Sequence, residues 1–581
     1  MHNPHIPGIY VAEQKYVLNP LRIDNRCLAG FVGIAERGPL HTPVLIKSFD
    51  EYLKTFGAFD TAGNLPFSVY NFYKCGGAEC VVVRTANENH AKKAQLKAKC
   101  SGGGHVVFEA LSEGSWGNHI VARIWHETDE IAKAIGIDTA GGAWIASEEK
   151  DISAGDVLQI SLFGQQYLRN VKKIEENKLF LDKPVKSFEK LEIPLQDIKV
   201  EKAYISVTLS CKGASENFLH LSMNPASARY YLSYINGRSR LCTVSSDGAK
   251  GIVKPVFPQP LSCGMEGIAQ MTAKDFIGEY NGPNHLRGLG ALESRDDISV
   301  IAVVDISWLQ TQTGLNEAER EQAMFAVQTA MINQAERFPG RFAVLDVPGH
   351  LDGAKILSWA KRFDSACGAA YYPHIDMIDP LDKTGAKTVR IPPSGAICGS
   401  IAAVDSQKGI FHAPANTLLH GAAGLANQVT DTEFEMLFPA GINLLRYFPG
   451  RGIKIWGART LSSDPSWRYI NVRRTFSAIC RSLKTGTQWA VFETNEKNLW
   501  KRIVRQVSGF LLDLWMKGYL AGSTPEQGYY VRCDEELNPP ENINNGIVTF
   551  AVGLAITKPT EFYNIAITAE KDGASVYINE Q

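Results

Sequence analysis

The sequence predicts a mixed α/β protein with a β-rich domain inserted into its first half. From about residue 290 onward, continuous apolar runs alternate with helical patterns, which is typical of an α/β layer with an at least partly parallel sheet. Residues 105–212 instead show short alternating runs separated by turn residues, the pattern of a β-rich domain. The composition agrees with a folded protein, because 45% of the residues are apolar and 21% are charged, as in ordinary globular proteins.

Length and charge limit the possible function classes. The 581 residues suffice for three or four domains of ordinary size. The net charge of −1 gives no overall field toward nucleic acid or a membrane surface. The first residues lack a signal-peptide pattern, and no apolar run approaches the roughly 18 residues of a membrane span. We therefore expect synthesis and folding in the cytoplasm, without nucleic-acid binding or direct membrane insertion.

The chain begins with a segment that reads as an arm. Prolines and a glycine disfavour a helix over residues 1–22, whereas Ile9, Tyr10 and Val11 favour a short strand. A strand too short to fold alone is marginal in water unless a sheet receives it.

The next elements are short and strongly patterned. Ser48 is the expected N-cap of a helix over residues 48–57, and Gly57 is expected to end it. The elements expected before residue 101 are, in order, a strand over 27–35, helices over 48–57 and about 66–75, and a buried strand over 80–85.

The inserted region is expected to begin at a flexible joint, Gly102–Gly104. Its expected strands lie at 119–125, 157–163, 178–182 and 204–210. Residues 213–285 show a mixed pattern that predicts no particular fold.

The second half contains longer elements. Strands are expected over 299–305 and 341–347, and helices over 316–337 and 351–367. Near the end, residues 547–556 read as a strand, and residues 562–569 alternate as a half-buried strand before a polar tail.

No motif for catalysis, cofactor binding or metal binding is found. The sequence lacks a Walker A loop, a Gly-x-Ser-x-Gly elbow and a His-Glu-x-x-His pair. Its 11 cysteines are scattered singly, which favours reduced buried thiols over a disulfide framework or zinc site. We interpret Asp405, His412 and Asn416 as loop residues rather than as a polar site. No catalytic residue, metal or cofactor is therefore predicted.

One helix stands out between Thr494 or Asn495, the expected N-cap, and Gly518. Its wide apolar face is formed by Leu499, Trp500, Ile503, Val504, Val507, Phe510, Leu511 and Leu514. Its opposite face is basic and carries Lys497, Lys501, Arg502 and Arg505. Two interpretations are open, an ordinary solvated face and a docking strip for an acidic partner.

Several motifs follow one another along the chain. They are PGIYVAE at 7–13, FVGIAERGPLHTPVLIKSFDEYLKTFG at 31–57, YKCGGAECVVVRT at 73–85, GSWGN at 114–118, RFAVLDVP at 341–348 and YYPHI at 371–375. The densest series lies at 443–522, with NLLRYFPGRGIKIWGART, SWRYINVRRTF, WAVFETNEKNLW and GFLLDLWMKGYLAG, followed by FAVGLAITKPTEFYNIAIT at 550–568. Their order and spacing resemble the tail sheath family of contractile phages, R-type pyocins and extracellular contractile injection systems. Residues 120–285 match weakly.

The resemblance implies an α/β core made from both chain ends, with an outer region inserted between them. The implied division is an N-terminal arm (1–22), a first core part (23–100), an outer region (101–285, β-rich at 105–212), a second core part (286–558) and a C-terminal strand and arm (559–581).

The resemblance also implies a structural function. Subunits would stack as hexameric rings around an inner tube, meet baseplate and terminal cap proteins, and contract to drive the tube through a target envelope. The particle, a phage tail or an injection system, would assemble in the bacterial cytoplasm and leave the cell by lysis.

Two sets of site residues follow from this implied function. The basic face of Lys497, Lys501, Arg502 and Arg505 would bind the tube. The terminal arms would exchange strands with neighbouring subunits, because an unpaired strand satisfies its backbone groups by joining another sheet. The arm residues concerned are Ile9, Tyr10 and Val11 at one end and Phe562, Asn564, Ala566 and Thr568 at the other.

Two alternatives belong to other classes. A cytosolic α/β enzyme would need a convergent polar pocket. A static capsid-like or tube protein would assemble without contraction. Electron microscopy of the expressed chain would separate these interpretations, because long striated hollow cylinders indicate a sheath and dispersed globules indicate another class.

Overall fold

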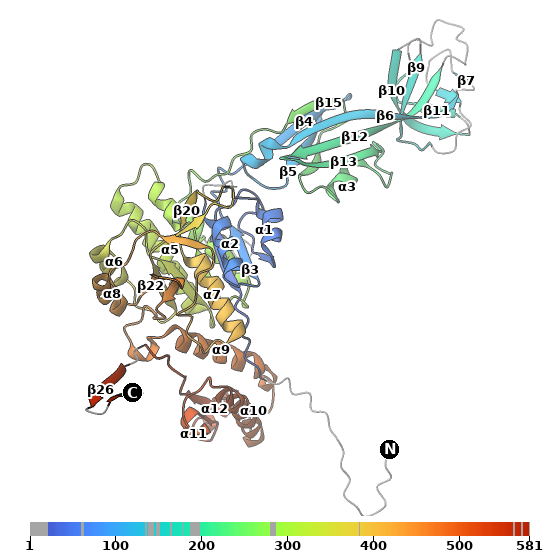
Figure 1. Cartoon of the computed structure of the whole chain (residues 1–581). Coiled ribbons are helices and arrows are strands. Elements are labelled where there is room, and N and C mark those ends of the chain that lie inside the picture. The colour runs from blue at the N-terminus through green and yellow to red at the C-terminus, as the bar shows by residue number, and fades with distance from the viewer. Residues whose placement is uncertain are drawn as a thin grey trace, which may run out of the picture.

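The computed structural model describes residues 21–59, 63–133, 136–137, 144–146, 152–162, 165–176, 178–185, 198–278, 286–382, 384–561, 564–570 and 573–579. For residues 131–133, 136–137, 146, 162, 564–570 and 573–579 it describes the backbone alone. The molecule is elongated (Figure 1), with a central α/β part between a β-rich outer region and a helical C-terminal region.

The central part is built on an eight-stranded sheet. Its spatial order is β2 (Val44–Ile46), β3 (Cys80–Arg84), β1 (Ala29–Gly33), β16 (Val300–Val303), β17 (Phe342–Asp346), β18 (Gly368–Tyr372), β22 (Ile442–Phe448) and β23 (Gly452–Trp456). The six inner strands are parallel, and β2 and β23 close the edges as antiparallel strands. The two halves of the chain meet where Ala29 pairs with Val300. The predicted α/β class with a partly parallel sheet is confirmed.

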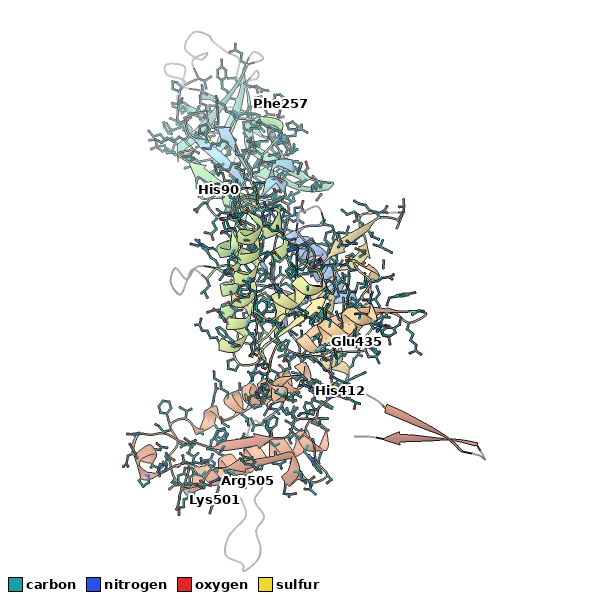
Figure 2. All side chains as sticks on the ribbon, turned by 90° about the vertical axis from the view of Figure 1, so that its left-hand side faces the viewer. His90, Phe257, His412, Glu435, Lys501 and Arg505 are labelled. Atoms are coloured by element: carbon teal, nitrogen blue, oxygen red, sulfur yellow. The ribbon has the colours of Figure 1, made fainter. Side chains whose placement is uncertain are left out.

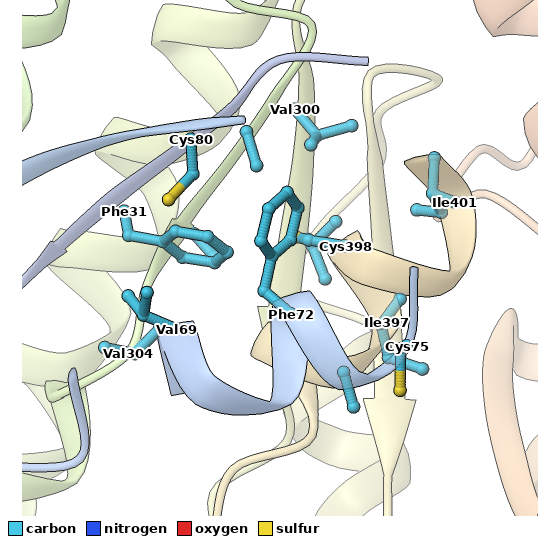
Figure 3. Close-up of a cluster of buried hydrophobic side chains, with 14 of the residues drawn as sticks. Phe31, Val69, Phe72, Cys75, Cys80, Val300, Val304, Ile397, Cys398 and Ile401 are labelled. Atoms are coloured by element: carbon cyan, nitrogen blue, oxygen red, sulfur yellow. The ribbon is translucent and has the colours of Figure 1, made fainter. Parts of the chain in front are cut away.

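Both faces of this sheet are covered by helices, which explains why its strands read as continuous apolar runs. One face packs against α1 (Phe49–Phe56), α2 (Leu65–Lys74) and α7 (Ser394–Gln407). Phe31 of β1 meets Phe72 of α2 edge to face on this side, with ring centroids 5.4 Å apart (Figure 3). Val32, the next residue, points to the other face, against the 3₁₀ helix η4 (Gly288–Ser294), α5 (Glu317–Arg337) and α6 (Gly353–Ala360).

Polar caps fix the ends of these helices. The Glu51 amide donates to the Ser48 hydroxyl, as predicted for the first helix. Two carboxylates also lie at helix starts, Asp305 buried and Asp346 half-buried. Asp305 accepts from the amides of Ile34 and Asn64 before α2, and Asp346 accepts from the Ser394 amide at 2.9 Å at the start of α7. Burial raises the pKa of Asp305 to about 6 and that of Asp346 to about 7.

The outer region consists of two sheets. The smaller sheet contains β14 (Cys242–Asp247), β5 (His105–Ala110) and β4 (Gln95–Lys99). The larger follows the order β15 (Val256–Pro260), β6 (Val121–Lys133), β12 (Lys199–Cys211), β9 (Val157–Leu162), β10 (Gln165–Glu175), β11 (Lys178–Leu181), β8 (Trp144–Ala146) and β7 (Gly136–Ile137), with β13 (Ala214–Leu221) beside β12. A helix, α3 (Tyr231–Asn236), lies with β13 and β14. The strands expected over 105–212 are therefore present, and strands continue to residue 260.

The expected joint at Gly102–Gly104 is wrong. These glycines form the turn of the antiparallel β4–β5 hairpin, because Gly103 and Gly104 adopt the positive φ angles of 99° and 72° that such a turn requires. The chain instead crosses between regions where Lys92 and Met265 exchange two backbone hydrogen bonds of 2.9 Å. The buried Arg84 fastens this crossing, donating to the carbonyl oxygens of Gly38 at 2.8 Å and Glu113 at 3.0 Å.

Shorter elements complete the central part. They are α4 (Ala273–Ile277), the sheet of β20 (Thr388–Ile391), β19 (Ile375–Ile378) and β21 (Ala422–Leu425), and α8 (Asp431–Leu437). The predicted helix over 351–367 is shorter than expected, since α6 ends at Ala360 and a turn follows.

The C-terminal region is mostly helical. Its elements are α9 (Ile470–Gly486), α10 (Lys497–Met516), α11 (Pro525–Gly528), β24 (Tyr529–Arg532), α12 (Pro540–Asn544), β25 (Ala551–Leu554), β26 (Asn564–Glu570) and β27 (Gly573–Asn579). The strand predicted over 547–556 shrinks to the four residues of β25, which pair only with β24 in the described sheets.

Candidate assembly site

The apolar face of α10 holds the C-terminal region together. Leu499, Trp500, Ile503, Val507, Phe510, Leu511 and Leu514 are buried, as predicted, and Val504 is half-buried. This face packs with side chains from α9, β24 and β25. The N-cap is Glu496 rather than Thr494 or Asn495. The Asn495 side chain accepts a hydrogen bond from the indole N–H of Trp500 at 2.9 Å.

The structure divides the four predicted basic residues into two kinds. Lys497 forms an ion pair with Glu535, and this carboxylate raises the pKa of Lys497. Arg502 lies 3.5 Å from Glu493, and its guanidinium stacks 4.4 Å from the centre of the Trp489 ring. Lys501 and Arg505 are exposed and take part in none of the ion pairs described here. Of the four predicted residues, Lys501 and Arg505 are therefore the cations available to an outside partner.

Lys501 and Arg505 lie at the end of the molecule opposite the outer region (Figure 2). Arg505 borders a groove of about 800 Å³ between α10 and the chain at Leu21–Asn25. Asp513 and Lys517 border the same groove and pair with each other. Arg505 is thus one i,i+4 step from Lys501 and beside the point where the N-terminal chain reaches the C-terminal region.

Exposed apolar side chains accompany these cations, and the sequence analysis missed them. Leu512 and Met516 are 37% and 65% exposed on α10, and Val491 and Phe492 are 62% and 104% exposed in the preceding turn. Phe492 also has a positive φ angle of 67°, which is uncommon for a bulky residue. A surface of this composition is typical of a protein contact. The run WAVFETN contains an indirect signal for this exposed surface, since Val491 and Phe492 are apolar residues placed in a turn.

The arm residues are only partly described. Ile9, Tyr10, Val11 and Phe562 lie outside the described residues. Asn564, Ala566 and Thr568 lie in β26, which pairs antiparallel with β27 from Asn564↔Asn579 to Glu570↔Gly573. The expected polar tail is therefore a second strand of a hairpin. This hairpin extends away from the helical region (Figures 1 and 2).

Two ion pairs join the central part to the C-terminal region. Arg474 of α9 donates to both oxygens of Asp405 in α7, at 2.9 and 2.5 Å, with side chains 3% and 2% exposed. Burial raises the pKa of Asp405. Arg459, which follows β23, donates to both oxygens of Glu561 at 2.9 and 2.5 Å. The interpretation of Asp405 as a loop residue is therefore wrong.

Asp405, His412 and Asn416 have separate partners. Asp405 pairs with Arg474, the His412 ring packs at a tilt against Phe411, and Asn416 accepts a hydrogen bond from Lys454. Within the described part of the chain, no group of three metal-ligating side chains occurs, and no helix has the length and hydropathy to cross a membrane. All 11 cysteines are free thiols, and burial raises the pKa of Cys27 and Cys80 to about 12.

Comparison with known families matches two consecutive stretches of the chain. Residues 278–461 match the phage tail sheath protein central domain, and residues 462–570 match the phage tail sheath C-terminal domain. Together they span about half of the 581 residues. The chain belongs to the phage tail sheath family. It is a structural subunit of a contractile sheath, as the motif order indicated.

Curated tail sheath proteins agree with this assignment. A prophage major tail sheath protein of Pseudomonas aeruginosa is 24% identical over 355 residues, which cover 56% of this chain and 89% of that protein. The tail sheath protein of Burkholderia phage BcepMu is 28% identical over 320 residues, covering 52% and 63% respectively.

Solved structures show the same fold over nearly the whole length. The helical sheath of the anti-feeding prophage in its contracted state has a TM-score of 0.52 at 19% identity, covering 97% of this chain and 99% of that chain. The sheath complex of PVC, an extracellular contractile injection system, in its contracted state has a TM-score of 0.51 at 18% identity, covering 98% and 99%.

Proposed function

We propose that this sheath subunit polymerises as stacked hexameric rings around an inner tube and that its terminal arms join neighbouring subunits by strand exchange. The observation that carries the proposal is the C-terminal hairpin. Its two strands pair with each other and with no other strand in the described sheets, so both outer edges keep free backbone donors and acceptors. Such edges add readily to another sheet.

The C-terminal region offers a matching acceptor. The β24–β25 ribbon also has only two strands among those described, and a two-stranded ribbon is marginally stable until further strands join it. Because the hairpin and the ribbon are different surfaces, a contact between them is heterologous and continues from subunit to subunit. Joints of this kind can persist while the bodies they join rotate, which suits a sheath that contracts.

The basic part of α10 is proposed to face the tube. Lys501 and Arg505 are exposed at the end opposite the outer region, and Leu512 and Met516 add apolar contact area on the same helix. Each exposed ion pair contributes only about 0–1 kcal/mol. Repetition over many subunits makes the sum substantial, and individually weak contacts can release during contraction.

The wider setting is part of the proposal and is supported by the family and by the solved structures. Structural relatives include the anti-feeding prophage baseplate, and we propose that this subunit likewise meets a baseplate and a terminal cap. We infer a purely structural protein without catalytic activity, made in a bacterial cytoplasm, assembled into a particle and released by lysis.

Deletion of residues 2–15 tests the strand-exchange model. This segment is too short to fold alone, so we expect its removal to expose little core, and the shortened chain should still fold and melt cooperatively by circular dichroism. It should form no cylinders, extended or contracted, in negative-stain microscopy of the same sample. Normal cylinders from a folded, shortened chain would show that the N-terminal arm is not the linker.

A further inference from the structure

The C-terminal arm is fastened to the central part at its root. Arg459 Nε lies 2.9 Å from Glu561 Oε1, and Arg459 Nη2 lies 2.5 Å from Glu561 Oε2. Arg459 follows the edge strand β23, and Glu561 lies three residues before β26. The pair therefore connects the last strand of the central sheet with the base of the projecting hairpin.

Arg459 is held in place independently of Glu561. Its amide donates to the Asn443 side chain at 2.7 Å, and Asn443 donates back to the Arg459 carbonyl oxygen at 2.8 Å. Its guanidinium lies 4.0 Å from the centre of the Phe438 ring. A guanidinium fixed by stacking presents a rigid fork that matches a carboxylate in one orientation. The central part is therefore prepared to receive Glu561.

The position of this pair is unusual among the described ion pairs. Most have at least one strongly exposed partner, whereas the side chains of Arg459 and Glu561 are only 10% and 13% exposed. Among the described pairs, Asp405–Arg474 is more protected, and Lys202–Asp156 is comparably protected at 17% and 4%. Burial weakens solvent screening, so such a pair holds its geometry more firmly than a surface pair.

The chain around Glu561 rests against the central part as well. Pro559, Thr560 and Glu561 border a cavity of about 410 Å³ whose other walls include Phe434 and Trp456. The ion pair of Glu561 therefore lies beside this cavity, three residues before the hairpin begins.

We propose that Arg459 and Glu561 are positioning residues that fix the direction in which the C-terminal hairpin leaves the subunit. The inference rests on the proposed function, in which that hairpin joins a neighbouring subunit. A hairpin fixed at its root meets its acceptor in one orientation, and little orientational freedom is lost on joining. A hairpin free at its root reaches many directions, and its effective concentration at the acceptor falls.

The experiment compares the wild-type chain with three substitution variants and one truncated chain. Glu561→Gln keeps the shape of the side chain and removes the charge, and Arg459→Lys keeps the charge and removes the fork. Glu435→Gln is the matched control, because Glu435 is exposed on α8 (Figure 2), the helix whose Phe434 lines the same cavity as Glu561, and it takes part in none of the described ion pairs. A chain ending at Glu561 lacks the hairpin altogether. Each form is assessed by circular dichroism melting, amide hydrogen exchange over residues 556–561, and negative-stain counting of cylinders.

Glu561→Gln should melt like the wild type, because the pair lies at the edge of the fold. Its amides over 556–561 should exchange about tenfold faster, and the fraction of subunits in regular cylinders should fall about tenfold, which corresponds to about 1.4 kcal/mol. Arg459→Lys should show both effects more weakly, and Glu435→Gln neither. If Glu561→Gln failed to fold, the effect of Arg459→Lys on exchange and on cylinders would decide whether the ion pair positions the hairpin.

The outcomes separate this inference from the proposed function. Normal cylinders from the chain ending at Glu561 would refute hairpin exchange itself. Loss of cylinders in that chain, with normal cylinders from both Glu561→Gln and Arg459→Lys, would leave hairpin exchange standing and overturn the positioning role. Loss of regular cylinders in Glu561→Gln, together with faster amide hydrogen exchange over residues 556–561, supports the positioning role.

Discussion

Replacing Asp405 by Asn tests how the central part and the C-terminal region are joined. The change removes the negative charge beside Arg474 while keeping the size of the side chain. Both side chains are almost fully buried, at 2% and 3% exposure, so water cannot replace the lost partner. The remaining neighbour described for the guanidinium is the Cys27 sulfur at 3.7 Å, a weak acceptor.

The expected cost follows from this geometry. Breaking a buried ion pair by removing one partner costs about 3–5 kcal/mol, because the other charge stays buried without compensation. Asparagine still accepts one hydrogen bond, so we expect about 3 kcal/mol. Asp405 lies in α7 and Arg474 in α9, so the C-terminal region should unfold at lower urea concentration than the central sheet.

Tryptophan fluorescence during urea unfolding measures this cost, since Trp489, Trp500 and Trp515 all pack in the C-terminal cluster. Asp513→Asn is the control, because Asp513 pairs with Lys517 on the surface and its loss should cost about 0.5 kcal/mol or less. A variant with Asp405→Leu and Arg474→Met should recover most of the stability, since apolar replacement of a buried pair is often neutral. A loss below about 1 kcal/mol in Asp405→Asn, or no recovery in the double variant, would refute the reasoning.

Three further predictions follow. Replacing both Lys501 and Arg505 by Glu should give sheaths that assemble poorly on tubes or contract prematurely, which electron microscopy would show. Normal extended particles from this variant would contradict a tube-facing role. Replacing residues 93–264 by a short linker at the paired backbones of Lys92 and Met265 should leave sheath assembly largely intact, whereas loss of all cylinders from a folded core would show that the outer region is required. Asp346→Asn should flatten the pH dependence of stability. Because the pKa of Asp346 is raised from 3.8 to about 7, the folded chain holds a proton that the unfolded chain releases, and stability falls as pH rises between these values, by up to about 4 kcal/mol. Urea unfolding midpoints of the wild type and of the variant at about pH 4.5 and about pH 7.5 measure how stability changes with pH. The same change in both proteins would contradict the role of Asp346.

Local pattern predicted many individual elements of this chain. Ser48 caps α1 and Gly57 ends it, and the apolar face of α10 is buried almost residue for residue. These features depend on contacts within one or two turns of chain, so the spacing of residue types reveals them. The basic face of α10 was found for the same reason, because residues four apart share a helix face.

The partners of those elements came only from the tertiary structure. Spacing placed four cations on one face, but Glu535 and Glu493 neutralise Lys497 and Arg502 from other segments. The glycines at 102–104 signal a turn or a joint equally well, and only the pairing of β4 with β5 decides between them.

The sequence by itself determined the α/β class, the positions of the long elements and, through the order of its motifs, the sheath family. The tertiary structure alone decided that β1 lies beside β16, that a hairpin ends the arm, and that Asp405 with Arg474 and Arg459 with Glu561 join the central and C-terminal regions. The physical reason is distance along the chain. Periodicity and capping report interactions within a few residues, whereas pairing between distant segments is selected by the packing of the whole fold.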